Sequence, residues 1–104
     1  EMCIRDSYSA GGDGVVDAQE INALTLYAVG SKTTISNIDI YCTSDDGVEI
    51  FGGTVNLSYL NINYADDDGL DTDEGYQGTN QFVFVLQGFG YGDKGMELDG
   101  DEWM

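Results

Sequence analysis

Carboxylates are the side chains through which this sequence could do chemistry. The 104 residues carry 20 Asp and Glu against 3 Lys and Arg, with no His, for a formal net charge of -17. Paired carboxylates can act as a general acid and base, and clustered ones can bind a hard cation such as Ca²⁺. Because there is no His, the sequence excludes Ser-His-Asp catalysis and His-ligated zinc.

The same charge balance limits the partners. A nucleic-acid binder needs Lys and Arg to neutralise phosphates, and anionic membrane surfaces repel an acidic chain. No apolar run approaches the roughly 20 residues that a membrane helix needs. The sequence therefore predicts no nucleic-acid partner and no membrane insertion.

The acidic residues belong to an internal repeat. Residues 35–50 (ISNIDIYCTSDDGVEI) align without a gap on residues 57–72 (LSYLNINYADDDGLDT), 22 positions later. The alignment matches three apolar positions as well as the Asp-Asp-Gly triplet. Chance could supply one such triplet, but hardly the apolar positions too, so a repeat architecture is indicated.

Looser copies flank this pair. Residues 23–35 match 47–57 with two residues inserted, 93–98 match 45–50, and 78–86 match 53–61 through their Gly-Thr pairs. The repeat units then begin at Ala23, Gly47, Gly69 and Gly95. The spacing drifts, as expected when only the connecting loops change length.

Each unit holds short stretches that alternate apolar and polar residues, separated by turns of Gly, Asp, Asn and Ser, with no room for a crossover helix. We therefore predict an all-β, right-handed parallel β-helix (solenoid) of about three to four coils. Two inward ladders are predicted, Leu24–Val48–Leu70–Met96 and Leu26–Ile50–Thr72–Leu98. An antiparallel sandwich is the alternative, although it needs no fixed register.

Three segments resemble a known family: residues 20–38, 45–56 and 67–82 are similar to secreted bacterial β-helix proteins of the pectin-lyase-like superfamily. The resemblance implies a secreted or cell-surface location and further coils in a parent protein. Residues 1–7 resemble translated adapter sequence and are interpreted as non-native. Residues 8–22 are expected to be irregular, and 23–104 to be coils truncated at both ends.

Stacking the coils would also stack the carboxylates. Three columns are predicted: Glu49, Asp71 and Glu97; Asp45, Asp67 and Asp93; and Asp46 and Asp68. At about 4.8 Å between rungs, neighbouring charges repel by roughly 1 kcal/mol in water and 3–4 kcal/mol at an effective dielectric near 20. Binding of Ca²⁺ would relieve this repulsion, and a solvated acidic edge is the alternative. The candidate calcium ligands are Asp45, Asp46, Glu49, Asp67, Asp68, Asp71, Asp93 and Glu97.

A second calcium candidate lies near the N-terminus. The segment DGVVDAQEI resembles the back half of an EF-hand loop, with Asp13, Asp17 and Glu20 as ligands. The first two ligand positions of such a loop fall on Ser9 and Gly11, and no amphipathic helix follows Glu20. The segment is therefore a secondary candidate.

An enzymatic interpretation rests on Asp46, Asp67 and Asp68. The resemblance to polygalacturonase-type hydrolases would place these carboxylates together as the acid and water-activating base of an inverting reaction. However, the His and the Arg-Ile-Lys segment of those enzymes are absent here. A surface this acidic would also repel polygalacturonate.

The remaining residues favour packing over chemistry. Cys42 has the parity of Ile38 and Ile40, which predicts a buried free thiol. Nine aromatic residues are expected in the core or in stacked ladders, with sugar-binding platforms as the alternative: Tyr27, Phe51, Tyr59, Tyr64, Tyr76, Phe82, Phe84, Phe89 and Tyr91. The function expected is a non-catalytic β-helix module for adhesion or for binding a polysaccharide or surface ligand. A carbohydrate-active enzyme and a structural spacer are the alternatives.

Overall fold

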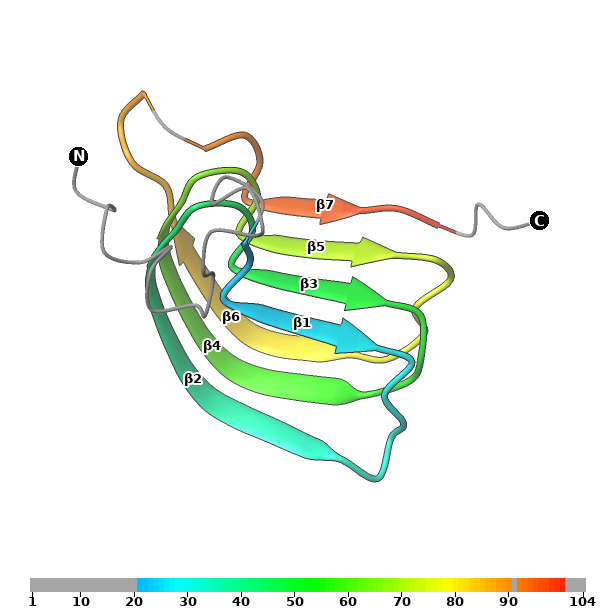
Figure 1. The fold of residues 1–104 in the computed structure, drawn as a ribbon. Coiled ribbons are helices and arrows are strands. Elements are labelled where there is room, and N and C mark those ends of the chain that lie inside the picture. The colour runs from blue at the N-terminus through cyan, green and yellow to red at the C-terminus, as the bar shows by residue number, and fades with distance from the viewer. Residues whose placement is uncertain (1–20, 91, 101–104) are drawn as a thin grey trace.

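Within the part of the chain that the structure describes, the fold consists of seven parallel β-strands (Figure 1). The computed structural model describes residues 21–90 and 92–100. Four short strands are β1 (Leu24–Tyr27), β3 (Val48–Phe51), β5 (Leu70–Asp73) and β7 (Met96–Leu98). Three longer strands alternate with them along the chain: β2 (Thr34–Thr43), β4 (Asn56–Ala65) and β6 (Asn80–Leu86).

The two kinds of strand form two separate sheets. The short strands pair in the order β1-β3-β5-β7, and the long ones in the order β2-β4-β6. In Figure 1 the chain passes from one sheet to the other and back, and each circuit lies on the previous one. The protein is thus a right-handed parallel β-helix of about three turns, as predicted, and the antiparallel sandwich is wrong.

The strand register confirms the main repeat. Val48 pairs with Leu24 on one side and with Leu70 on the other, and Leu70 pairs with Met96. In the second sheet, Ile40 pairs with Ile62. Both predicted inward ladders are therefore present, because the apolar residues of successive coils must stack to leave water.

Left-handed backbone residues make the corners of the coil. Ala28, Gly52 and Glu74 follow the first three short strands and have φ of 51°, 66° and 51°. A left-handed residue also interrupts each long strand, at the aligned positions Asn37, Tyr59 and Phe82. Repeating one backbone conformation at one position bends every coil alike, so that the coils stay stacked.

The core is the tube between the two sheets. Its middle coil is the best covered, since Val48, Ile50 and Ile62 are all 0% exposed. The last coil has nothing over it among the described residues, so its ladder residues Met96 and Leu98 are 44% and 64% exposed. Burial in the tube thus depends on having a neighbour on both sides.

The third coil corrects one detail of the sequence alignment. The Gly-Thr match would place Val85 over Leu60, but the structure pairs Leu60 with Val83 and Ile62 with Val85. The register thus differs by two residues from that alignment. Apolar inward positions fix the register, whereas the Gly-Thr pairs lie in loops of different length, which are free to shift.

Two predictions about packing are corrected in part. Cys42 is buried, as expected, but it is disulfide-bonded rather than free. Several aromatic rings lie outside the core, stacked or edge-on in neighbouring coils: Tyr27 on Phe51, Tyr59 on Phe82, and Tyr41 against Tyr64. The ladder prediction is confirmed for Tyr27, Phe51, Tyr59, Tyr64 and Phe82. The core prediction is wrong for Phe84 and Phe89, which are exposed.

Candidate carboxylate site between the coils

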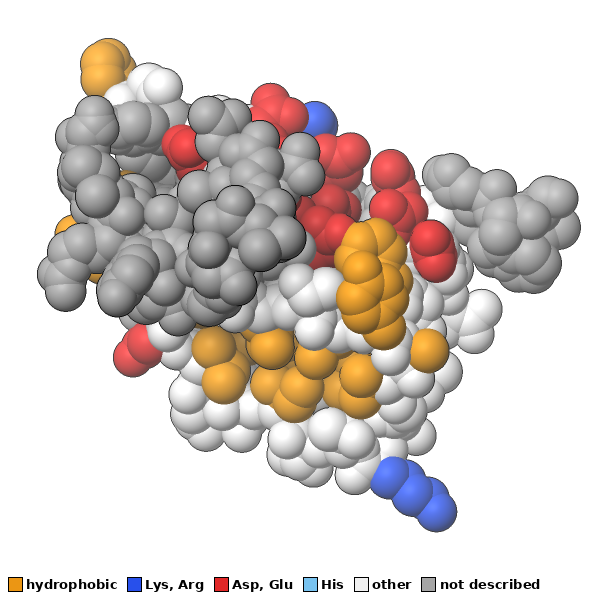
Figure 2. Space-filling view, in the orientation of Figure 1, with side chains coloured by type: hydrophobic (Ala, Val, Ile, Leu, Met, Phe, Trp, Pro, Cys, Tyr) orange, Lys and Arg blue, Asp and Glu red, His pale blue; other side chains and the backbone are white. Residues whose placement is uncertain are grey.

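The Asp-Asp-Gly triplets lie in the turns that lead from a long strand to the next short strand. Each turn sits on the one before it, because the N–H of Asp67 donates to the carbonyl of Asp45 at 3.1 Å and the N–H of Asp93 donates to that of Asp67 at 2.7 Å. The predicted column Asp45–Asp67–Asp93 is therefore present. Acidic side chains gather over the β5 and β7 part of the face shown in Figure 2.

The second aspartate of each triplet joins a ladder of side chain to backbone bonds. Asp46 Oδ1 accepts from the N–H of Asp68 at 3.0 Å, and Asp68 Oδ1 accepts from the N–H of Lys94 at 2.9 Å. Below them, Asn22 Oδ1 accepts from the N–H of Asp46 at 2.9 Å. One oxygen from every coil thus satisfies a backbone donor of the next, which stabilises the stacked turns.

Sequence reasoning missed Asn22. It is the residue before Ala23, just as Asp46 and Asp68 precede Gly47 and Gly69 at the start of their repeat units. Its Nδ2 also donates to Glu49 Oε1 at 3.2 Å. Reading the repeat one residue further upstream would have found this polar position.

Burial changes the ionisation of the ladder. Asp46 and Asp68 are only 2% and 3% exposed, so the solvated-edge alternative is wrong for these two residues. Desolvation raises the pKa of Asp46 to about 7 and that of Asp68 to about 6. Hydrogen bonds with Glu49 and Glu97 contribute to these upward shifts of the two pKa values, and the backbone donors oppose them.

A second acidic column lies beside the ladder. Glu49, Asp71 and Glu97 are in register on β3, β5 and β7, as predicted. Desolvation, followed by repulsion from Asp46 and Asp68, raises the pKa of Asp71 to about 7. The raised pKa values of the neighbouring Asp46 and Asp71 indicate that the carboxylates cannot all ionise at neutral pH without a compensating charge.

Lys94 offsets the negative charge of the carboxylates only at the end of the stack, at Asp93 and Glu97. Its Nζ lies 2.9 Å from Asp93 Oδ2 and 3.2 Å from Glu97 Oε1. All three side chains are substantially exposed, so these ion pairs contribute little to stability. The buried carboxylates of the middle coils have no comparable pairing with a cation among the described residues.

In residues 21–90 and 92–100, three groups of carboxylates are close enough to share a cation, with ligand atoms within 4.8 Å of one another. They are Asp45–Asp46–Glu49, Asp46–Asp68–Asp71 and Asp67–Asp68–Asp93. Seven of the eight predicted calcium ligands thus come together in threes, and Glu97 joins none of these groups. The secondary candidate Asp13, Asp17 and Glu20 lies outside the described residues.

The three candidate catalytic carboxylates are neighbours, but two of them face away from solvent. Asp46 and Asp68 use one oxygen each in the ladder and are buried. A general acid or base must reach the proton that it transfers, directly or through one water. Burial thus keeps the carboxylates of Asp46 and Asp68 from direct contact with the solvent.

These features define the class of protein to which the chain belongs, the parallel β-helix proteins. Residues 4–103 match the family described as the pectate-lyase like beta helix domain, and the chain belongs to this family. Searches of curated proteins and of solved structures gave no match. Among the described residues, no helix is long and apolar enough to cross a membrane.

Proposed function

We propose that this β-helix acts as a non-catalytic module, secreted or displayed at the cell surface, that binds a ligand or mediates adhesion. The observation that carries the proposal is the burial of Asp46 and Asp68. These carboxylates accept hydrogen bonds from the next coil and so hold the coils together. The strong negative charge favours solubility outside a cell, and the stacked coils offer long outer surfaces to a ligand.

The competing proposal is a polysaccharide hydrolase that uses Asp46, Asp67 and Asp68. Incubation with neutral and acidic polysaccharides, followed by a reducing-sugar assay, separates the two proposals. We expect no release above that of a heat-inactivated sample. Release that Asp67→Asn abolishes would overturn the non-catalytic proposal.

We further propose that Ca²⁺ stabilises the module through the groups around Asp46 and Asp68. Carboxylates are the oxygen ligands that Ca²⁺ prefers, and each of these groups supplies three. A bound cation would balance the charge that otherwise forces protons onto Asp46 and Asp71. The ladder uses one oxygen of Asp46, so an ion would bind through the other in place of the proton that Asp46 shares with Glu49.

Calcium should therefore raise the melting temperature at pH 7.5. For a cation that binds only the folded chain, a concentration 100-fold above Kd adds about 2.7 kcal/mol to the free energy of unfolding. The measurement is a thermal melt in EDTA, in millimolar Ca²⁺ and in the same concentration of Mg²⁺. Equal melting temperatures in EDTA and Ca²⁺ would contradict the proposal that calcium stabilises the module.

A further inference from the structure

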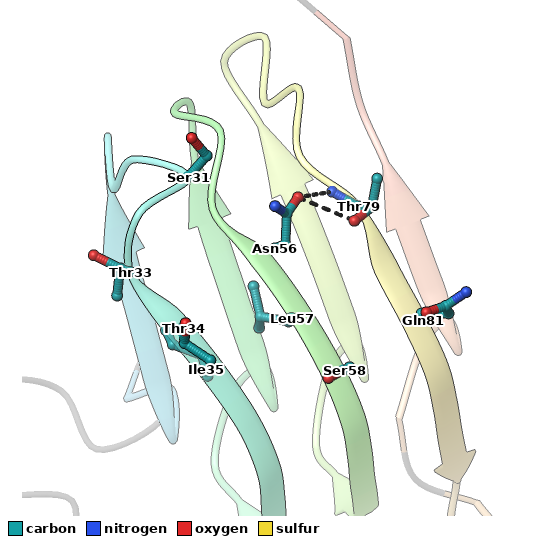
Figure 3. Close-up of a pocket in the computed structure, with 9 residues that line it drawn as sticks. All are labelled: Ser31, Thr33, Thr34, Ile35, Asn56, Leu57, Ser58, Thr79 and Gln81. Carbon is teal, nitrogen blue, oxygen red and sulfur yellow. Dashed lines mark hydrogen bonds between the residues drawn. The ribbon is translucent and has the colours of Figure 1, made fainter.

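A second surface, remote from the acidic turns, carries a groove with no ionisable side chain. The groove has a volume of about 240 Å³ and lies where β2, β4 and β6 begin (Figure 3). Seven of its nine lining residues carry a hydroxyl or an amide, and two are aliphatic. In a chain with 23 ionisable Asp, Glu, Lys and Arg side chains (20 acidic plus 3 basic), a groove lined without any of them selects for an uncharged ligand.

Hydrogen bonds fix one wall of this groove. Asn56 Oδ1 accepts from both the N–H and the hydroxyl of Thr79, each at 3.0 Å. Figure 3 shows the Asn56 oxygen turned to Thr79 and its nitrogen turned to the opposite side, where β2 lies. The amide is thereby held with its donor toward the groove, and the hydroxyls of Ser31 and Thr34 can both donate and accept.

An exposed aromatic pair adjoins the groove. Tyr59 and Phe82 each follow a lining residue, Ser58 and Gln81, in the sequence. Their rings are stacked, with centroids 4.8 Å apart and planes 17° apart, and they are 55% and 59% exposed. Leu57 and Leu60 on either side of Ser58 and Tyr59 are buried, so both intervening side chains face outward.

Flat aromatic faces beside neutral hydrogen-bonding groups match the two sides of a sugar. The C–H face of a pyranose ring packs on an aromatic ring, and its hydroxyls need partners that both donate and accept. Uronic or sulfated sugars would be repelled by a net charge of -17. We propose that the groove at the start of β2, β4 and β6, together with the Tyr59–Phe82 pair, binds a neutral oligosaccharide.

This proposal deepens the proposed binding function and rests on it. The test is isothermal titration calorimetry of the whole chain with neutral hexasaccharides of glucose, mannose and xylose, and with hexagalacturonate as the acidic counterpart. We expect at least one neutral hexasaccharide to bind and hexagalacturonate not to bind. Tyr59→Ala should lower the affinity for the neutral hexasaccharide at least tenfold. Gln81→Ala, which keeps both aromatic rings, should lower it several-fold.

The matched control is Tyr27→Ala. Tyr27 is also exposed and stacked, on Phe51, but it belongs to the other sheet, so its loss should leave the affinity unchanged. Circular dichroism confirms that each variant is folded. The proposal is overturned if no neutral hexasaccharide binds, if Tyr27→Ala weakens binding as much as Tyr59→Ala does, or if the wild type self-associates through this surface and Tyr59→Ala abolishes that association. These results are independent of the reducing-sugar assay, which tests whether the module is non-catalytic.

Discussion

At pH 7.5 and without calcium, the Asp46→Asn variant should be more stable than the wild type, by on the order of 2–4 kcal/mol. Burial raises the pKa of Asp46 from 3.8 to about 7, and each unit of such a shift corresponds to about 1.4 kcal/mol. An asparagine keeps the oxygen that accepts from Asp68 and cannot ionise. Asn22 already fills the equivalent position one coil earlier, where its amide donates to Glu49.

The pH dependence of the wild type follows from the same shift. Between pH 3.8 and about 7 the folded chain binds more protons than the unfolded chain, so the free energy of unfolding falls as the pH rises. Asp68 and Asp71, whose pKa values are also raised, act in the same direction. Urea unfolding in EDTA should therefore show a more stable wild type at pH 5 than at pH 7.5, and a smaller difference for Asp46→Asn.

Asp66→Asn is the matched control for this prediction. Asp66 is exposed and directly precedes Asp67, whose N–H donates to the carbonyl of Asp45. The substitution therefore removes one negative charge of the same kind without changing the Asp46–Asp68 ladder. It should change stability by less than about 0.5 kcal/mol. An Asp46→Asn variant less stable than the wild type at both pH values would show that the ladder needs an ionised carboxylate.

The Asp46→Asn variant also distinguishes stabilisation by protonation of Asp46 from stabilisation by bound calcium. Asp46 belongs to two of the three groups that could hold a cation. If Ca²⁺ binds there, Asp46→Asn should lose most of the calcium-dependent rise in melting temperature while remaining stable in EDTA. If Ca²⁺ raises the melting temperature of Asp46→Asn as much as that of the wild type, the ion binds to other carboxylates.

A methyl group added at Gly69 should destabilise the fold by about 1–3 kcal/mol, as overpacking commonly does. A Cβ there would lie 2.6 Å from the carbonyl oxygen of Gly95 and 2.6 Å from Val85 Cγ1, both in the next coil. Backbone stacked at this distance cannot move aside without breaking the ladder. The free energy of unfolding of Gly69→Ala, measured in urea, checks the prediction.

Gly95→Ala is the control for Gly69→Ala, because Gly95 holds the same position one coil later. A Cβ at Gly95 would meet nothing within 4 Å. The substitution should thus be close to neutral. Equal losses of stability at Gly69 and Gly95 would contradict the close stacking of the coils.

Most of the fold could be predicted from the sequence because the repeat is visible in apolar side chains. Water drives residues such as Ile40 and Ile62 into one tube, and a one-residue slip would expose a whole strand, so spacing along the chain determines register. The alignment of β6 failed where it relied on Gly and Thr of a loop, since loop residues carry no such penalty.

The candidate site was only partly predictable. The columns of carboxylates followed from the repeat, but the burial of Asp46 and Asp68 did not, because aspartate is normally a surface residue. Their inward position depends on backbone donors in the next coil, which no pattern of residue types reveals. The groove beside Tyr59 was missed for a similar reason, since the left-handed residue places two consecutive side chains on the outer face.

The stacking of equivalent residues is the claim on which every proposal depends, and nuclear Overhauser effects between methyl groups test it most directly. Parallel strands lie about 4.8 Å apart, so methyl contacts are expected from Ile40 to Ile62 and from Ile62 to Val85. Close contacts between α-protons of paired strands, the mark of antiparallel pairing, together with no Ile40–Ile62 contact, would contradict it.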